Sequence, residues 1–197
     1  PITLKKPKPL LEINNITMLE KNINLIKEMG INKILINTFY LKEHFSTFIK
    51  DKNFNLDINI IEDGKNILDT GGGILNMIKD SSEEDFIVFN PDTIWSNEYQ
   101  NEILKMQEIF FSKKLENILL LVNKKLSFDK SFVGDFNLSN NLISKNDKID
   151  FIYTGCQILN KRILMSQNKR KFSILNIWNK LIDEKKLYGF ESKQKFY

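Results

Sequence analysis

Three consecutive glycines mark the most informative stretch of the sequence, residues 69–74, which read Asp-Thr-Gly-Gly-Gly-Ile. The run lies between a predicted strand that ends at Ile61 and a predicted helix that begins at Ile74. One glycine is enough for a tight turn, whereas three in a row remove every side chain from a surface, so that a flat or anionic ligand can lie against the backbone. This pattern favours a nucleotide. The alternative is a flexible loop, because a short glycine run is a weak signal by itself.

A carboxylate follows the next predicted strand. Residues 86–90 form a short, continuous apolar run, which is typical of a buried central strand in a parallel sheet, and Pro91 and Asp92 come directly after it. Ligands of open α/β sheets bind at the carboxyl ends of the strands, so Asp92 is well placed to hold the hard cation that accompanies a triphosphate. The alternative is that Asp92 is an ordinary turn residue after a proline.

Composition restricts the class of protein. A chain of 197 residues fits one domain with a core of useful size, and 42% hydrophobic with 27% charged residues is ordinary for a globular protein. No apolar stretch approaches the roughly 18 residues that span a membrane, so neither a membrane segment nor a secretion signal is predicted. The single cysteine, Cys156, excludes an internal disulfide and cannot form a zinc cluster with the single histidine, His44. We therefore expect a cytoplasmic protein.

The net charge of +4 and the pI near 9 could suggest nucleic acid as a partner. The lysines, however, are scattered through amphipathic segments and do not gather into one basic stripe with interleaved aromatic residues. A modest positive potential suits phosphorylated small molecules equally well, so the sequence favours these over nucleic acid.

Helical and strand patterns alternate through the first two thirds of the chain. Helices are predicted at residues 17–29, 41–49, 74–78 and 98–111, and strands at 33–37, 56–61, 86–90 and 118–123. Strands separated by helices of this length predict βαβ crossovers, and so an α/β fold with a mostly parallel central sheet and helices on both faces.

The pattern changes after Phe128. Short β-like pieces at residues 132–138 and 142–144 predict a small β-hairpin insertion with its turn at Asn140 and Asn141, followed by a strand at 149–159, a helix at 173–184 and a strand at 187–191. No linker divides the chain, which indicates a single domain over residues 1–197. The chain opens on a proline-rich loop without a preceding strand, although doubly wound sheets begin with a central strand, so we expect upstream residues to be missing.

Several segments together resemble the sugar-phosphate nucleotidyltransferases, most closely N-acetylmuramate 1-phosphate uridylyltransferases and their relatives. The likeness covers nearly the whole chain. It rests on residues 5–13 (Lys-Lys-Pro-Lys-Pro-Leu-Leu-Glu-Ile), 34–37, 68–74 and 88–92, and on the later segments 134–136, 153–155 and 172–175.

The resemblance implies a Rossmann-like nucleotidyltransferase fold and a reaction in which a sugar 1-phosphate attacks the α-phosphate of a nucleoside triphosphate, releasing pyrophosphate, with Mg²⁺ holding the phosphates. Such a transfer depends on positioning and charge neutralisation, so that a lysine, backbone amides and carboxylates suffice. By resemblance, Lys8 neutralises phosphate charge, Thr70, Gly71 and Gly72 face the nucleotide, Asn90 shapes the neighbouring loop and Asp92 binds the metal.

A second group of candidates follows from the same resemblance. Glu62 and Asp69 flank the glycine run, while Asp135, Thr154 and Gly155 lie where such enzymes hold the sugar. Simpler interpretations stay open: Lys8 can be a solvated lysine, Asp135 a turn residue, and residues 153–155 an ordinary strand with a bulge. The resemblance also implies a nucleotide-binding part over about residues 1–125 and a sugar-phosphate-binding part over about 126–197.

The chain departs from the family pattern at both ends. It lacks the glycine-rich signature loop that precedes the Lys-Pro-Lys-Pro segment and the terminal Trp-x-Asp-x-Gly-Thr segment, and Pro91 stands where glycine is commoner. UTP is the expected nucleotide ahead of GTP. The open alternatives are a mannose or heptose 1-phosphate guanylyltransferase, a catalytically silent sugar-nucleotide-binding domain and, least favoured, a nucleic-acid-binding protein.

Overall fold

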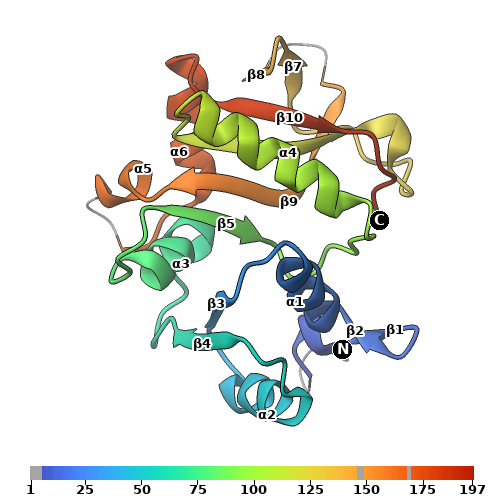
Figure 1. Cartoon of the computed structure of the whole chain (residues 1–197). Coiled ribbons are helices and arrows are strands. Elements are labelled where there is room, and N and C mark those ends of the chain that lie inside the picture. Colours follow the sequence, from blue (N-terminus) through green and yellow to red (C-terminus); the bar gives the residue numbers. More distant parts are fainter. Residues whose placement is uncertain (1–5, 146–148, 168–169) are drawn as a thin grey trace.

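A mixed six-stranded sheet forms the larger layer of the structure (Figure 1). The computed structural model describes residues 6–145, 149–167 and 170–197, so residues 1–5, including the first residue of the Lys-Lys-Pro-Lys-Pro segment, lie outside the described part. In spatial order the strands are β5 (Asp85–Phe89), β9 (Phe151–Asn160), β6 (Asn117–Asn123), β10 (Tyr188–Ser192), β8 (Leu142–Ser144) and β7 (Asn137–Ser139).

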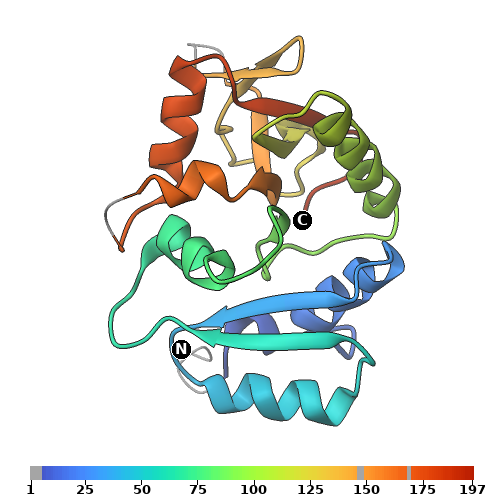
Figure 2. The same cartoon turned by 60° about the vertical axis from the view of Figure 1, so that its left-hand side comes forward.

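A separate parallel pair, β3 (Lys33–Thr38) and β4 (Asp57–Glu62), lies beside this sheet. The pair lies below α3 and β5 in Figure 1, and Figure 2 shows α2 along its outer side. A short hairpin of β1 (Glu12–Ile13) and β2 (Ile16–Thr17) precedes it. The sequence did not predict this hairpin.

Helices cover both faces of the sheets. They are α1 (Met18–Glu28), α2 (Lys42–Lys52), α3 (Asp69–Ile78), α4 (Tyr99–Ser112), α5 (Arg162–Met165) and α6 (Ile174–Asp183), with the short 3₁₀ turns η2 (Lys8–Leu10) and η3 (Lys124–Leu126).

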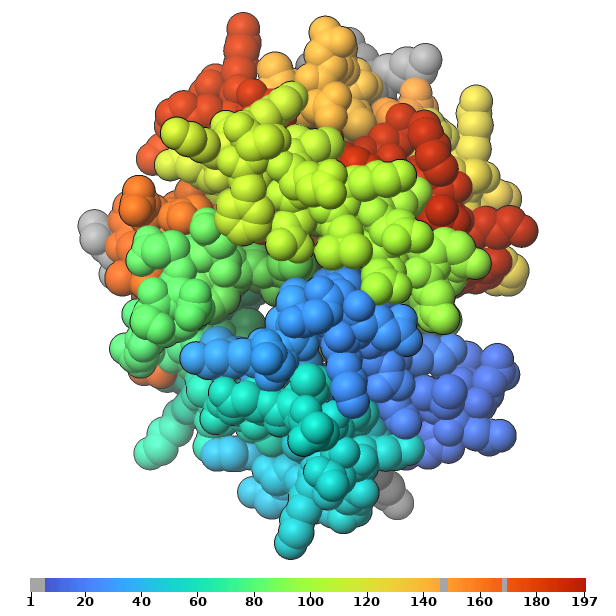
Figure 3. Space-filling model, in the orientation of Figure 1, coloured from blue at the N-terminus to red at the C-terminus, as the bar shows by residue number. Residues whose placement is uncertain are grey.

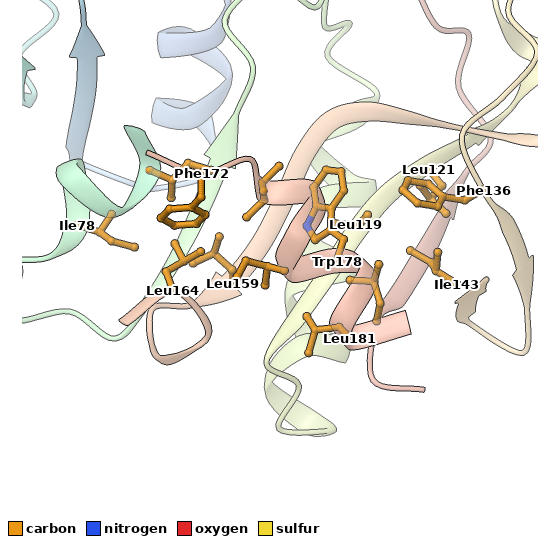
Figure 4. Packing of buried hydrophobic residues seen from close by; sticks show 14 residues of the cluster. Ile78, Leu119, Leu121, Phe136, Ile143, Leu159, Leu164, Phe172, Trp178 and Leu181 are labelled. Carbon is orange, nitrogen blue, oxygen red and sulfur yellow. The ribbon is translucent and has the colours of Figure 1, made fainter. Parts of the chain in front are cut away.

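Strand β6 explains how two cores form on opposite sides of one sheet. Successive side chains of a strand point to opposite faces, and every residue from Asn117 to Val122 is buried. Leu119 and Leu121 pack in the core on the α3 and α6 side, whereas Ile118 and Leu120 pack in the core beneath α4. Figure 4 shows the first of these cores, in which α6 lays its apolar face on the sheet: Ile78, Leu119, Leu121, Phe136, Ile143, Leu159, Leu164, Phe172, Trp178 and Leu181.

The predicted α/β class with helices on both faces is confirmed, but the central sheet is mixed and not mostly parallel. β9 runs antiparallel to both of its neighbours, and the parallel pairs are β3 with β4 and β6 with β10. β5 was predicted to be a buried central strand; it is instead a partly buried edge strand of the six-stranded sheet. A local apolar run indicates only that a strand is buried. The position of β5 in the sheet depends on its partner β9, which lies more than 60 residues later, and no local pattern shows that pairing.

The predicted hairpin insertion is confirmed. Asn140 and Asn141 have φ values of 50° and 63°, the left-handed conformation that asparagine tolerates in two-residue hairpin turns. The first strand of the hairpin is shorter than expected, because only Asn137–Ser139 pairs with β8. Phe136 instead makes an isolated bridge to Phe151.

The reactivity of the Cys156 thiol provides a test of the burial of β9. Its side chain is fully buried under α4, and this burial raises the pKa of the thiol above its ordinary value. Because the thiolate is the reactive form, we expect labelling by a soluble disulfide reagent at pH 8 to be about a hundredfold slower than after unfolding in urea. Labelling at the same rate in both conditions would contradict the buried placement of Cys156.

Candidate functional site

Lys8 and Asp92, which are 84 positions apart in the sequence, meet in an ion pair with 2.7 Å between Nζ and Oδ2. Asp92 follows β5 by three residues, as predicted, and Lys8 opens η2 directly after Pro7. The two side chains are 58% and 40% exposed, so this pair contributes only about 0–1 kcal/mol to stability. The pair therefore adds little to the stability of the fold, and the binding roles of Lys8 and Asp92 stay predictions.

The segment that carries Asp92 rests on β9. The Asn90 amide donates to the Gly155 carbonyl at 2.6 Å, and the Thr93 hydroxyl donates to the Thr154 carbonyl at 2.8 Å. Gly155 has a φ of +93°, and a Cβ there would lie 2.8 Å from the Asn90 Cβ, so only glycine allows this approach. Gly155 therefore helps to fix the backbone on both sides of Asp92.

Thr154 is buried beneath that segment. Only 1% of it is exposed, and its hydroxyl donates to the Leu120 carbonyl at 2.9 Å. The pairing of β6 with β9 also shifts register here, between Leu119 and Leu121. These contacts support the simpler interpretation of residues 153–155 as a strand with a bulge, and they leave the Thr154 hydroxyl no free face for a sugar.

The sequence suggested that the glycine run forms a loop before a helix. In the structure the run instead lies in the first turns of α3. A Cβ at Gly71 would lie 2.4 Å from the Phe172 ring, and one at Gly72 would lie 2.4 Å from the Arg170 carbonyl oxygen. Gly72 also donates its amide hydrogen to the Phe172 carbonyl at 3.0 Å. The missing side chains thus admit residues 170–172 of this chain, a long-range contact that no local pattern could reveal.

Thr70 and Asp69 also lie where α3 contacts residues 170–174. Asp69 has a φ of 63°, and its Oδ1 accepts a hydrogen bond from the Thr70 amide at 2.6 Å. The Thr70 hydroxyl oxygen accepts one from the Ile174 amide, at the start of α6, at 3.0 Å. A nucleotide role for Thr70, Gly71 and Gly72 stays a prediction, and it requires the ligand to approach from a side that residues 170–174 do not cover.

A buried carboxylate near the same helix was missed by the sequence analysis. Asp63 is 6% exposed, and its two carboxylate oxygens accept hydrogen bonds from the Asn37 and Asn76 side-chain amides at 3.0 and 3.2 Å. Glu62, the predicted candidate, is exposed and faces Lys42 at 3.5 Å. β4 ends between these two acidic neighbours, and no sequence signal distinguished the inward side chain from the outward one.

Replacing Asp63 with alanine should destabilise the protein by about 1–3 kcal/mol, because the Asn37 and Asn76 amides would lose their acceptor in a partly buried place. Glu62→Ala is the matched control, and we expect it to change stability by less than about 0.5 kcal/mol. Urea unfolding monitored by circular dichroism measures both. Equal effects of the two substitutions would argue against the Asp63 cluster.

Asp135 lies at the start of the hairpin insertion. Its backbone amide donates to the Phe151 carbonyl at 2.7 Å, and its exposed carboxylate accepts from the Tyr153 amide at 2.9 Å. Within the described part of the chain, neither Asp135 nor Glu62 makes a hydrogen bond or ion pair with Lys8 or Asp92. The structure therefore joins Lys8, Asn90 and Asp92 with Thr154 and Gly155, and it leaves Glu62 and Asp135 at separate places.

A divalent cation fits the chemistry at Asp92. Within residues 6–145, 149–167 and 170–197, no group of three or more acidic, histidine or cysteine side chains could enclose a metal ion. Mg²⁺ does not need such an enclosure, because it keeps several waters and is held by one or two carboxylates together with substrate phosphates. In the structure the Lys8 ammonium, which is itself a cation, lies beside the Asp92 carboxylate.

Comparison with known proteins identifies the family of the chain. A family model described as "Nucleotidyl transferase" matches residues 1–122, and the chain therefore belongs to that family. This confirms the resemblance to sugar-phosphate nucleotidyltransferases.

Two curated relatives match along most of the chain. D-glycero-alpha-D-manno-heptose 1-phosphate guanylyltransferase of Aneurinibacillus thermoaerophilus is 25% identical over 203 residues, covering 96% of this chain and 82% of the relative. N-acetylmuramate alpha-1-phosphate uridylyltransferase of Caulobacter vibrioides is 21% identical over 196 residues, covering 96% and 81%.

Solved structures share the fold. HddC from Yersinia pseudotuberculosis, in a complex with GMP-PN, has a TM-score of 0.73 at 22% identity, over 97% of this chain and 82% of that one. The inositol-1-phosphate CTP transferase from T. maritima has a TM-score of 0.74 at 15% identity, over 97% and 80%. Among the described residues, no helix combines the length and apolarity needed to cross a membrane.

Proposed function

We propose that this protein transfers a nucleoside monophosphate, UMP from UTP, to a sugar 1-phosphate, with release of pyrophosphate. The observation that carries the proposal is the Lys8–Asp92 pair at the carboxyl end of β5, where a cation-binding carboxylate and a phosphate-neutralising ammonium lie 2.7 Å apart. Family membership supplies the reaction class, and the pair supplies the groups that such a reaction needs.

The residues of this chain have simple roles in the proposal. Lys8 exchanges its Asp92 partner for a phosphate oxygen when substrate binds, so that the ammonium neutralises charge on the triphosphate. Pro7 and Pro9 flank Lys8 and restrict its backbone, which keeps the ammonium in place at low entropic cost. Asn90 holds the backbone before Asp92 through its bond to Gly155.

Asp92 would hold Mg²⁺, together with the phosphates and water. The metal, when bound, would offset negative charge on the phosphates and align them. Residues of the second part of the chain, with the exposed Asp135 as the first candidate, would contact the sugar. We also propose a cytoplasmic location, based on the single, buried cysteine.

GTP is the second candidate for the nucleotide. The A. thermoaerophilus relative is named a guanylyltransferase and the HddC structure holds GMP-PN, whereas the C. vibrioides relative is named a uridylyltransferase. Base choice depends on a few contacts in a pocket, so GTP with heptose or mannose 1-phosphate is the alternative pair of substrates.

Pyrophosphate release by the natural-length protein tests the proposal. UTP, GTP, CTP and dTTP are each paired with N-acetylmuramate, glucose, mannose and heptose 1-phosphates in the presence of Mg²⁺. We expect release with UTP and one of these sugars. Release only with GTP would support the guanylyltransferase alternative, and nucleotide binding without release would indicate a catalytically silent sugar-nucleotide-binding domain.

A further inference from the structure

A cavity opens at the amino-terminal ends of β3 and β4, and neither Lys8 nor Asp92 lines it. We call it the strand-end cavity; it is lined by residues 32–33, 49–50 and 53–58. Its volume of about 810 Å³ lies within the range of about 300–1,000 Å³ that is usual for small-molecule sites. Figure 3 shows the face of the molecule on which the start of β3, in blue, and the segment from α2 to β4, in cyan and teal, lie side by side.

The strand-end cavity is separate from the predicted nucleotide site. β3 and β4 are parallel strands of six residues each, and a strand of this length spans roughly 20 Å. The cavity lies at the beginning of both strands, whereas the glycine run follows the end of β4. A molecule in this cavity would therefore be a second ligand, beside the one that we predict at the glycine run.

The lining combines apolar and polar side chains. Phe54, Leu56 and Ile58 are partly buried and pack against the core that α1, α2 and β3 form. A lining of apolar side chains with a few polar groups is typical of a small-molecule site. The polar side chains of the lining are all exposed: Asn32, Lys33, Lys50, Asn53, Asn55 and Asp57.

Two lysines line the cavity from different elements. Lys33 opens β3, and Lys50 lies in the last turn of α2. Among the residues that the structure describes, neither of these side chains makes a hydrogen bond or an ion pair. Lys52, on the same turn of α2 but outside the lining, is instead paired with Glu20 at 2.9 Å. The two ammonium groups of the cavity are therefore available to an anion.

The loop that forms one wall of the cavity is held in place. Asn53 and Asn55 have φ values of 45° and 55°, the left-handed conformation that asparagine tolerates. Between them, the Phe54 carbonyl accepts a hydrogen bond from the Lys27 ammonium of α1 at 3.0 Å, and the Phe54 ring lies 5.9 Å from the Phe48 ring. Because these contacts order the loop without a ligand, binding should cost little conformational entropy.

The asparagines of the lining suit hydroxyl groups. The side-chain amides of Asn32, Asn53 and Asn55 have no hydrogen-bond partner within the described part of the chain. An amide side chain both donates and accepts, as a hydroxyl group does, so the two match. The lysines select the anionic group: a phosphate monoester carries about two negative charges and three acceptor oxygens, which two ammonium groups match better than they match the single charge of a carboxylate.

We propose that the strand-end cavity binds a small, hydroxyl-rich phosphate monoester, with Lys33 and Lys50 on the phosphate and the asparagine amides on the hydroxyl groups. Asp57 supplies the one carboxylate among the described residues of the lining, and the Asn59 amide donates to it at 2.7 Å. Two ammonium groups against one carboxylate leave the cavity with a net positive charge, which favours an anionic ligand.

Titration of the ¹⁵N-labelled natural-length protein, followed by NMR, tests the proposal. Glucose 6-phosphate is the probe, because its phosphate is not at C1 and it is not a sugar 1-phosphate. We expect it to shift the backbone amide signals of residues 32–33 and 53–57, and to bind about tenfold or more tightly than glucose, gluconate or inorganic phosphate. The measurement involves no turnover, so its result does not depend on the proposed function.

A pair of double variants tests the role of the two lysines. Lys33→Gln with Lys50→Gln should weaken the binding of glucose 6-phosphate by about tenfold or more, because the phosphate loses both ammonium groups. Lys79→Gln with Lys105→Gln is the matched control: it removes the same charge from two exposed lysines outside the lining, and the affinity should stay unchanged.

Three results would overturn the proposal. The first is the absence of shifts in residues 32–33 and 53–57 at glucose 6-phosphate concentrations up to about 10 mM. The second is equal binding of gluconate, inorganic phosphate or glucose, because the cavity would then not recognise a hydroxyl-rich phosphate monoester. The third is an equal loss of affinity in both double variants, which would show that net charge and not the lysines of the cavity attracts the ligand.

Discussion

Asp92→Asn is expected to reduce pyrophosphate release by about a thousandfold or more, while the protein stays folded. The substitution preserves the shape of the side chain and removes its negative charge. Asparagine is a poor ligand for a hard divalent cation compared with a carboxylate, and it no longer forms an ion pair with Lys8. Because that pair is largely exposed, its loss should change the stability by less than about 1 kcal/mol.

The measurement compares steady-state pyrophosphate release and thermal unfolding for the variant and the parent. Asp183→Asn is the matched control, since Asp183 is an exposed carboxylate at the end of α6 that makes no described contact with the Lys8–Asp92 pair. We expect the control to keep its activity and its unfolding temperature. An active Asp92→Asn variant would remove the metal-binding role from Asp92, and a variant that fails to fold would show that the role is structural.

Gly72→Ala is expected to destabilise the protein by about 1–3 kcal/mol. The added Cβ would lie 2.4 Å from the Arg170 carbonyl oxygen, which belongs to backbone and cannot rotate away. Moving residues 170–172 would break the hydrogen bond from the Gly72 amide to the Phe172 carbonyl and disturb the start of α6. Urea unfolding measures the loss, and nucleotide titration of the folded variant measures its effect on binding.

Gly30→Asn provides the control for Gly72→Ala. Gly30 has a φ of +80°, but an added Cβ there would meet no neighbouring atom within 4 Å, and asparagine tolerates this conformation better than other side chains. We expect its stability to change by about 0.5–1 kcal/mol at most. If Gly72→Ala were no more destabilising than Gly30→Asn, the contact between α3 and residues 170–172 would be looser than the structure shows.

Local pattern predicted most of the elements, because their apolar spacing is a property of neighbouring residues. The helix at α1 ends near Gly30 as expected, and the turn at Asn140 and Asn141 forms where two residues that tolerate positive φ stand together. The glycine run was predicted less well. Its sequence favoured an open loop, but α3 continues through it, because residues 170–174 supply the contacts that glycine usually lacks in a helix.

The candidate site was predicted in part. Asp92 was proposed because a carboxylate after an apolar strand is visible locally, and Lys8 because its segment resembles a family motif; the structure adds their ion pair, and their roles stay predictions. Asp63 was missed, since only the positions of Asn37 and Asn76 show that its side chain turns inward. Thr154 was given a place near a sugar, yet its hydroxyl bonds to β6.

The sequence by itself determined the α/β class, the order of the longer helices and strands, the hairpin turn and the residue types available for phosphate and metal chemistry. All of these depend on contacts or propensities within a few positions of the chain. The tertiary structure alone decided that β9 enters the sheet antiparallel between β5 and β6, that Lys8 meets Asp92, and that Gly72 packs on Arg170. Each of these contacts joins residues that are far apart in the chain, 84 positions in the case of Lys8 and Asp92. Over such separations the burial of apolar surface in the whole molecule, and not local preference, selects the partner.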